Sequence, residues 1–148
     1  MVARLALLAC AAALVAFGLT RHAAHDRCQQ ARVDALSIAL RKSPATDAPG
    51  VAGHLQADCR DVEELVNGAV AFARVGQVAP AARLAQAAVR REPERRNAWL
   101  ALQAVRQAEG DASGAARALA RARTLDPVGL GEPGGRGSLK RSSGRSTR

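Results

Sequence analysis

The sequence predicts an all-helical fold, and three observations lead to this prediction. Alanine, the strongest helix former, supplies much of the 48% of residues that are hydrophobic. Aromatic residues make up only 2% of the chain, and no Val- or Ile-rich run has the pattern of a buried parallel strand. Glycines and prolines recur at a fixed spacing in the middle of the chain, which is typical of helices joined by short turns. The length of 148 residues fits one domain.

The first expected element is a hydrophobic helix in residues 1–21. Its apolar run, residues 5–20, is closed by Arg21 and His22. A spanning helix needs about 20 apolar residues, and the apolar core of a signal peptide has about 7–15. The run lies between these two lengths. Three interpretations are therefore open: an uncleaved membrane anchor, which we favour, a cleaved signal, or a buried helix of a soluble protein.

Residues 22–61 are expected to form a helical hairpin. Residues 22–28 are interpreted as a juxtamembrane linker, because His22, His25 and Cys28 lack the fixed fourth ligand of a zinc site. No metal or cofactor is expected. A helix over 23–42, a loop over 43–50 and a shorter helix over 51–59 complete the hairpin. The inward side of its first helix consists of small and aliphatic residues: Ala31, Ala35, Ile38 and Ala39.

A repeat with a period of about 34 residues occupies 62–127, in two units, 62–95 and 96–127. Each unit predicts two helices, because apolar residues recur every three or four positions and a glycine with positive φ ends the first helix. The matched pairs are Gly76 with Gly110, Ala81 with Ala115, Ala88 with Ala122 and Pro93 with Pro127. The predicted inward faces are Leu65, Ala69 and Phe72, then Ala81, Leu84, Ala85 and Ala88, then Trp99, Leu102 and Val105, then Ala115, Leu119 and Ala122. Asp111 is a good N-cap for the last helix.

This pattern resembles the tetratricopeptide repeat, a helix-turn-helix unit that stacks into a solenoid. The second unit departs from it at Gln103, where a small residue is usual, and at Arg106, where an aromatic residue is usual. Two units are fewer than the three that a stable stack needs. Counting back one period from Val62 reaches Cys28, so the 22–61 hairpin is a candidate for a degenerate first repeat or cap.

Cys28 and Cys59 are the two cysteines outside the apolar run. If the chain is exported, they can form one disulfide, which would join the hairpin to the start of the repeats. The alternative is two unrelated buried thiols. A disulfide would indicate that the domain faces an oxidising compartment.

Residues 128–148 are rich in Gly, Ser and Arg and predict a disordered basic tail. The tail contributes to a net charge of +9. It has no aromatic residue on which bases stack, which disfavours a nucleic-acid partner. A solubilising tail is the simplest interpretation.

No catalytic constellation is recognisable, so the chain is not expected to be an enzyme or to take a small-molecule substrate. The resemblance implies a protein partner, a helix or an extended segment, bound along the first helices of the repeats. The candidate groove residues are Glu63, Val66, Asn67, Val70, Arg74, Asn97, Leu100, Ala104 and Gln107. They lack the Lys, Arg and Asn cluster with which chaperone-binding members of the family hold a peptide carboxylate.

The preferred hypothesis is a membrane-anchored scaffold or adaptor on the outer face of a bacterial cytoplasmic membrane. Its single pass would be the N-terminal helix, and cleavage of that helix would release a secreted protein. The richness in Ala and Arg suggests a bacterial genome of high GC content. The family also suggests cell-envelope machinery as a setting. The alternative is a cytoplasm-facing basic adaptor whose tail binds anionic lipid or nucleic acid.

Overall fold

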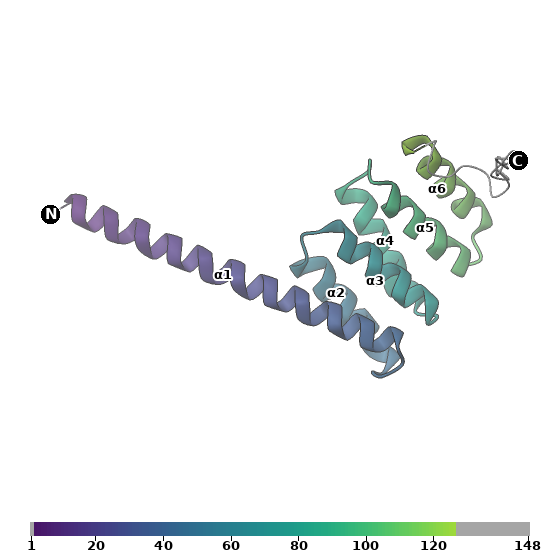
Figure 1. Cartoon of the computed structure of the whole chain (residues 1–148), viewed down its shortest axis with the longest axis horizontal. Helices are drawn as coiled ribbons and strands as arrows, with labels where there is room; N and C mark the ends of the chain where they lie inside the picture. Colours follow the sequence, from purple (N-terminus) through teal and green to yellow (C-terminus); the bar gives the residue numbers. More distant parts are fainter. Residues whose placement is uncertain (1, 127–148) are drawn as a thin grey trace, which may run out of the picture.

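The computed structural model describes residues 2–126 and contains helices but no strand within them. This confirms the all-helical fold class. The helices run in the order α1 (Val2–Ala39), the short 3-10 helix η1 (Ala45–Asp47), α2 (Ala48–Asp58), α3 (Val62–Arg74), α4 (Val78–Arg91), α5 (Arg96–Ala108) and α6 (Ala112–Leu125). The N-terminal part of α1 projects away from the other helices, which pack together at its C-terminal end (Figure 1).

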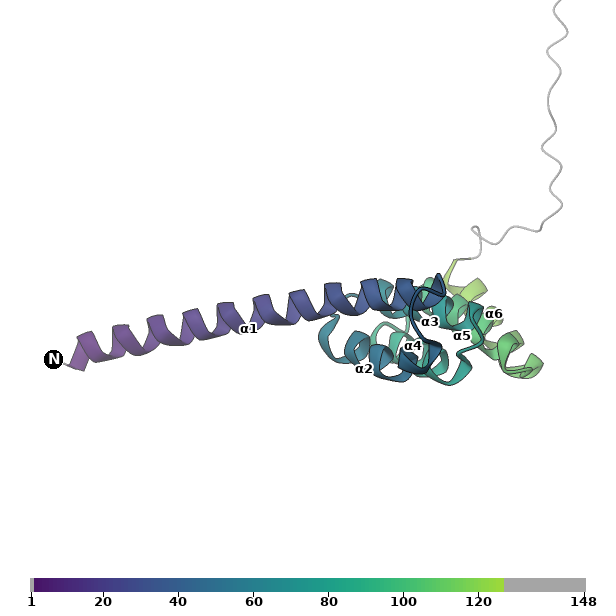
Figure 2. The same cartoon turned by 90° about the horizontal axis from the view of Figure 1, so that it is seen from below.

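The packed region is a row of three helical hairpins: α1 with α2, α3 with α4, and α5 with α6. Neighbouring hairpins contact each other in a regular way. The first helices form one layer, in which α1 packs on α3 and α3 packs on α5. In the other layer α2 packs on α4, and Figures 1 and 2 show the hairpins following one another along the row.

The second and third hairpins have the same boundaries, shifted by one repeat period. The helices α3 and α5 begin at Val62 and Arg96, and α4 and α6 begin at Val78 and Ala112. Gly76 and Gly110, which follow α3 and α5, have φ of 78° and 77°. Only glycine adopts this conformation without strain, so the sequence prediction for both glycines is confirmed.

The first hairpin ends its first helix in the same way. After α1 the positive φ, 57°, belongs to Arg41. The next backbone N–H, that of Lys42, donates to the carbonyl of Ser37 over 2.8 Å. Gln77 and Asp111 make the equivalent bonds, each of 2.9 Å, to Phe72 and Arg106. All three first helices therefore close with the same 6→1 hydrogen bond.

The core is built largely from alanine and a few aliphatic residues. The predicted inward faces of α3 and α4 are all buried, with Leu65, Phe72 and Leu84 among the largest enclosed side chains. Small residues let helices approach closely. Gly68 shows this best, because an added Cβ would lie 2.7 Å from Leu55 and 2.9 Å from Leu84.

The predicted inward face of α5 is wrong in part. Val105 is buried, but Trp99 and Leu102 are only half-buried. Ala98 and Ala101 are buried instead, on a helix that packs on α3, α4 and α6. The Trp99 indole lies at the edge of the core and donates from Nε1 to the carbonyl of Pro93 over 2.8 Å.

The first hairpin also differs in part from the prediction. Residues 22–28 belong to α1, as the helix predicted over 23–42 implies, and the linker interpretation of the same residues is wrong, because no glycine or proline interrupts the chain between Gly18 and Pro44. The helix ends at Ala39 rather than at residue 42. The second helix begins at Ala48 rather than at residue 51. Pro49 lies in its first turn, where the missing N–H has no partner to lose.

Among the described residues, none of the helices is both long and apolar enough to qualify as a membrane span. Most side chains of the predicted 1–21 anchor are not among those that the structure describes. The predicted tail, 128–148, likewise lies outside the described residues.

Candidate partner-binding groove

A disulfide joins Cys28 of α1 to Cys59, the residue that caps α2. Their sulfur atoms are 2.07 Å apart and their Cα atoms 4.9 Å apart. This confirms the pairing that the sequence offered for an exported chain. An ion pair of 3.0 Å between Arg27 and Asp58 lies beside it. The disulfide thus fixes α1 to the end of α2, where the connection to α3 begins.

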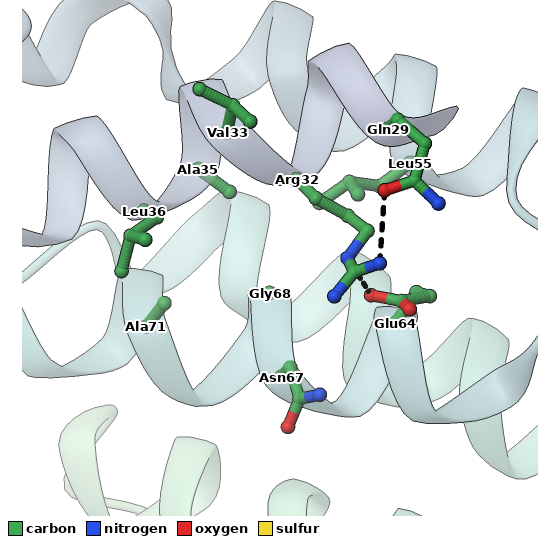
Figure 3. A pocket seen from close by; sticks show the side chains of 10 residues that line it. All are labelled: Gln29, Arg32, Val33, Ala35, Leu36, Leu55, Glu64, Asn67, Gly68 and Ala71. Atoms are coloured by element: carbon green, nitrogen blue, oxygen red, sulfur yellow. Dashed lines mark hydrogen bonds and ion pairs between the residues drawn. The ribbon is translucent and has the colours of Figure 1, made fainter. Parts of the chain in front are cut away.

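A groove of about 310 Å³ lies between α1 and α3 (Figure 3). One wall is the outer side of α1, where Val33 and Leu36 are each 58% exposed. The other wall is α3, with Asn67 and Ala71. Its volume is at the lower end of ligand pockets, which hold roughly 300–1000 Å³. The groove therefore suits one or two apolar side chains of a partner.

An ion pair closes one end of the groove. Nε of Arg32 lies 2.8 Å from a carboxylate oxygen of Glu64. The same guanidinium donates from Nη1 to the side-chain oxygen of Gln29 over 3.0 Å. In Figure 3 these three side chains gather at one end, and Leu36 and Ala71 lie at the other.

The two walls run in parallel. Arg32 lies opposite Glu64, and further along both helices Leu36 lies near Ala71 (Figure 3). Beyond these residues come Leu40, which directly follows α1, and Arg74 at the end of α3. Leu40 is 56% exposed, so Val33, Leu36 and Leu40 form a continuous apolar stripe along the outer side of α1 and its end.

The groove residues predicted from the sequence occupy different positions. Asn67 lines the groove, and Arg74 is exposed one turn beyond it. Val66 is buried and Val70 packs partly against the core, which leaves little of either side chain for a partner. The α5 residues of the predicted set lie on the next helix of the layer: Leu100 and Ala104 are half-buried, and Gln107 is exposed.

Glu63 and Asn97 are joined to each other rather than free. The Asn97 side-chain amide donates to Glu63 over 3.2 Å, and the Arg95 guanidinium donates to the same carboxylate over 3.3 Å. A hydrogen bond to Glu92 raises the pKa of Arg95 above its usual value. These contacts link α3 to the start of α5.

The wall that α1 contributes was not predicted from the sequence. Four of its lining residues precede predicted α3 positions by one repeat period: Gln29, Arg32, Val33 and Leu36 correspond to Glu63, Val66, Asn67 and Val70. Leu40, which follows α1 and lies outside the lining, corresponds in the same way to Arg74. Counting back one repeat period from the predicted α3 positions would have identified all five residues.

The signal was hidden because the first hairpin lacks the glycine and the closing proline and departs from the period. Arg41 precedes Gly76 by 35 residues (76 − 41), and the start of α2 at Ala48 precedes that of α4 at Val78 by 30 (78 − 48).

Comparisons with models of known protein families, with curated proteins and with solved structures returned no match. The groove is therefore interpreted from its own chemistry. Among the described residues, no three His, Cys, Asp or Glu side chains are grouped as metal ligands.

Proposed function

We propose that this protein is a protein–protein interaction module of the tetratricopeptide type. The observation that carries the proposal is the apolar stripe along α1, where Val33, Leu36 and Leu40 are more than half exposed beside an open groove. Large aliphatic side chains that are exposed together at the edge of a groove mark binding surfaces. A partner helix or extended segment would cover them.

Three repeated hairpins support the tetratricopeptide assignment. The spacing shared by the second and third hairpins, the positive φ after each first helix, and the packing of α1 on α3 and of α3 on α5 are features expected of such a solenoid. The disulfide-bonded first hairpin supplies the third unit that two recognisable repeats lack.

We further propose that the module is anchored to a membrane and faces an oxidising compartment. The Cys28–Cys59 disulfide supports a location in an oxidising compartment, since structural disulfides persist where thiols are not kept reduced. The continuity of α1 supports a direct connection between the apolar run and the groove wall. Scaffolding of cell-envelope proteins fits both features.

Site-specific photo-crosslinking in the producing cell tests the binding function. A photoreactive amino acid at position 36, in the groove wall, should form a crosslink to another protein. The same amino acid at position 90, an exposed site on α4 in the other layer, is the control. Crosslinks of equal yield at both positions, or at neither, would show that the groove is not a binding site.

Thiol labelling in intact cells tests the location. A membrane-impermeant maleimide should label Cys28 and Cys59 of a Cys10→Ala variant only after reduction. Free thiols that react only after lysis would contradict the proposed compartment. The cytoplasm-facing basic adaptor would then be the better hypothesis.

A further inference from the structure

The groove is flanked by positive charge at the end opposite the Arg32–Glu64 pair. Arg74 lies in the last turn of α3, and Arg41 and Lys42 follow α1. All three are exposed. Within residues 2–126, none of these three side chains has an ion pair or hydrogen bond. The groove lining is therefore neutralised at one end, and three unpaired cations follow the two helices beyond its other end, outside the lining residues.

The groove also offers hydrogen-bonding groups along its walls. The side-chain amides of Gln29 and Asn67 line it. Such amides pair with a peptide backbone, which has a donor and an acceptor at every residue, whereas a hydrocarbon chain gives them no partner. A polypeptide segment thus matches the groove better than a lipid does.

We infer that the groove binds an acidic amphipathic segment of a partner protein. Apolar side chains of that segment would cover Val33, Leu36 and Leu40. An Asp or Glu cluster at one end of the segment would lie against Arg41, Lys42 and Arg74. The inference rests on the proposed function and adds the chemical class of the partner and its direction along the groove.

The basic tail of this chain does not fit the same site. Five cations in residues 136–148 oppose no acidic residue there. Like charges repel, so the three unpaired cations disfavour the tail as an occupant. The partner is accordingly a different polypeptide.

A peptide selection tests the inference. The full chain is held in phosphatidylcholine nanodiscs, and peptides that bind it are selected from a random library of peptides about 12 residues long. Enriched peptides should combine two or more apolar residues with an Asp or Glu cluster. Enrichment of basic or uncharged peptides, or no enrichment, would overturn it. Crosslinking from position 36 is independent of peptide charge, so a crosslink together with basic peptides would refute this inference and leave the proposed function intact.

Variants then locate the bound peptide. Leu36→Ser should weaken binding about tenfold or more, because it removes exposed apolar surface without touching the core. Arg74→Glu should weaken it about three- to tenfold and reduce its salt dependence. Arg90→Glu makes the same charge change on α4 and should leave the affinity unchanged. Equal loss for Arg74→Glu and Arg90→Glu would show that only net charge matters, which contradicts the inference.

An anionic lipid is the competing occupant. The protein in nanodiscs that contain phosphatidylglycerol should bind the selected peptide as tightly as the protein in neutral nanodiscs does. If phosphatidylglycerol displaces the peptide from the wild-type protein but not from Arg74→Glu, the groove is a lipid site and the inference is wrong.

Discussion

The Arg91 guanidinium, at the end of α4, donates a hydrogen bond of 2.6 Å to the carbonyl of Cys59. A second bond from the same side chain goes to the carbonyl of Gln56. Both carbonyls lie at the C-terminal end of α2, where the last four carbonyls of a helix have no partner within it. One side chain of the second hairpin therefore completes the end of the first, beside the disulfide.

Replacing this side chain should destabilise the protein. Arg91→Ala removes charge-assisted hydrogen bonds, each worth about 1.5–3 kcal/mol, and leaves two carbonyls less well satisfied. We expect the free energy of unfolding in urea to fall by about 2–3 kcal/mol, less than the sum of two such bonds, because Arg91 is exposed and water partly replaces them. Arg90→Ala, at the adjacent exposed position, is the control and should change it little. Equal effects of the two substitutions would contradict this role of Arg91.

The disulfide should contribute substantially to the stability of the first hairpin. In the chain-entropy model a loop of about 32 residues gives about 3–4 kcal/mol of stability. A Cys28→Ser, Cys59→Ser double variant should lose this amount, and reductant should produce the same loss in the wild-type protein. Hydrogen exchange should rise first in α1 and α2, because the bond constrains that hairpin. Cys10→Ser is the matched control, and a protein whose stability resists reduction would argue against the expectation.

The same glycine substitution should have opposite effects at two positions. Gly76→Ala should destabilise the protein by about 1–2 kcal/mol, because a residue with a Cβ is strained at φ 78°. Nothing lies within 4 Å of a Cβ added there, so the cost is that of the backbone alone. Gly53→Ala, in the interior of α2 and equally open, should stabilise by about 0.5–1 kcal/mol. Urea unfolding followed by the fluorescence of Trp99 measures both.

Arg41 provides the converse test. It adopts a φ of 57° at the place in the helix-ending turn that Gly76 takes after α3, one residue before the position that the 34-residue period would give. Arg41→Gly should relieve about 1–2 kcal/mol of strain against about 0.5–1 kcal/mol of added chain entropy. The expected result is a higher urea midpoint. A lower midpoint would mean that the Arg41 side chain contributes a contact of its own.

Asp111 should make the stability of the last hairpin depend on pH. Its carboxylate accepts a hydrogen bond of 2.8 Å from the backbone N–H of Gly114 and another from the Ser113 hydroxyl. These bonds, the first above all, lower the pKa of Asp111 below its usual value of 3.8. The stabilisation is therefore fully present above pH about 5 and disappears as the pH falls through the lowered pKa.

The check is a comparison of Asp111→Ala with the wild-type protein at several pH values. The difference in unfolding free energy should be largest near neutral pH and shrink toward about pH 2. Ser113→Ala removes only the weaker bond and should show a smaller difference of the same sign. A difference that stays constant with pH would show that the ionised carboxylate is not what caps α6.

The sequence was enough to predict the central helices because their signals are local. Gly76, Gly110 and Pro93 limit helices through backbone constraints that hold in any fold. Leu65, Ala69 and Phe72 lie on one face by helical geometry alone. The Cys28–Cys59 pairing was also accessible, since only two cysteines lie outside the apolar run.

The places where prediction failed depend on distances between helices. Trp99 was predicted to lie inside because it is spaced with Leu102 and Val105 on one helical face and matches Leu65 one period earlier. In the structure Ala98 and Ala101 are the buried residues of this helix, together with Val105. Small side chains let neighbouring helices approach more closely than an inward tryptophan would. No local pattern reports such a distance.

The sequence by itself determined the fold class, the period, the turn glycines and the cysteines that can pair. Only the tertiary structure decided which helix completes the groove, by placing Arg32 of α1 against Glu64 of α3 and leaving Val33 and Leu36 exposed beside it. The reason is physical. Helical periodicity fixes which side chains share a face, but whether that face is covered depends on packing between segments that lie far apart in the chain.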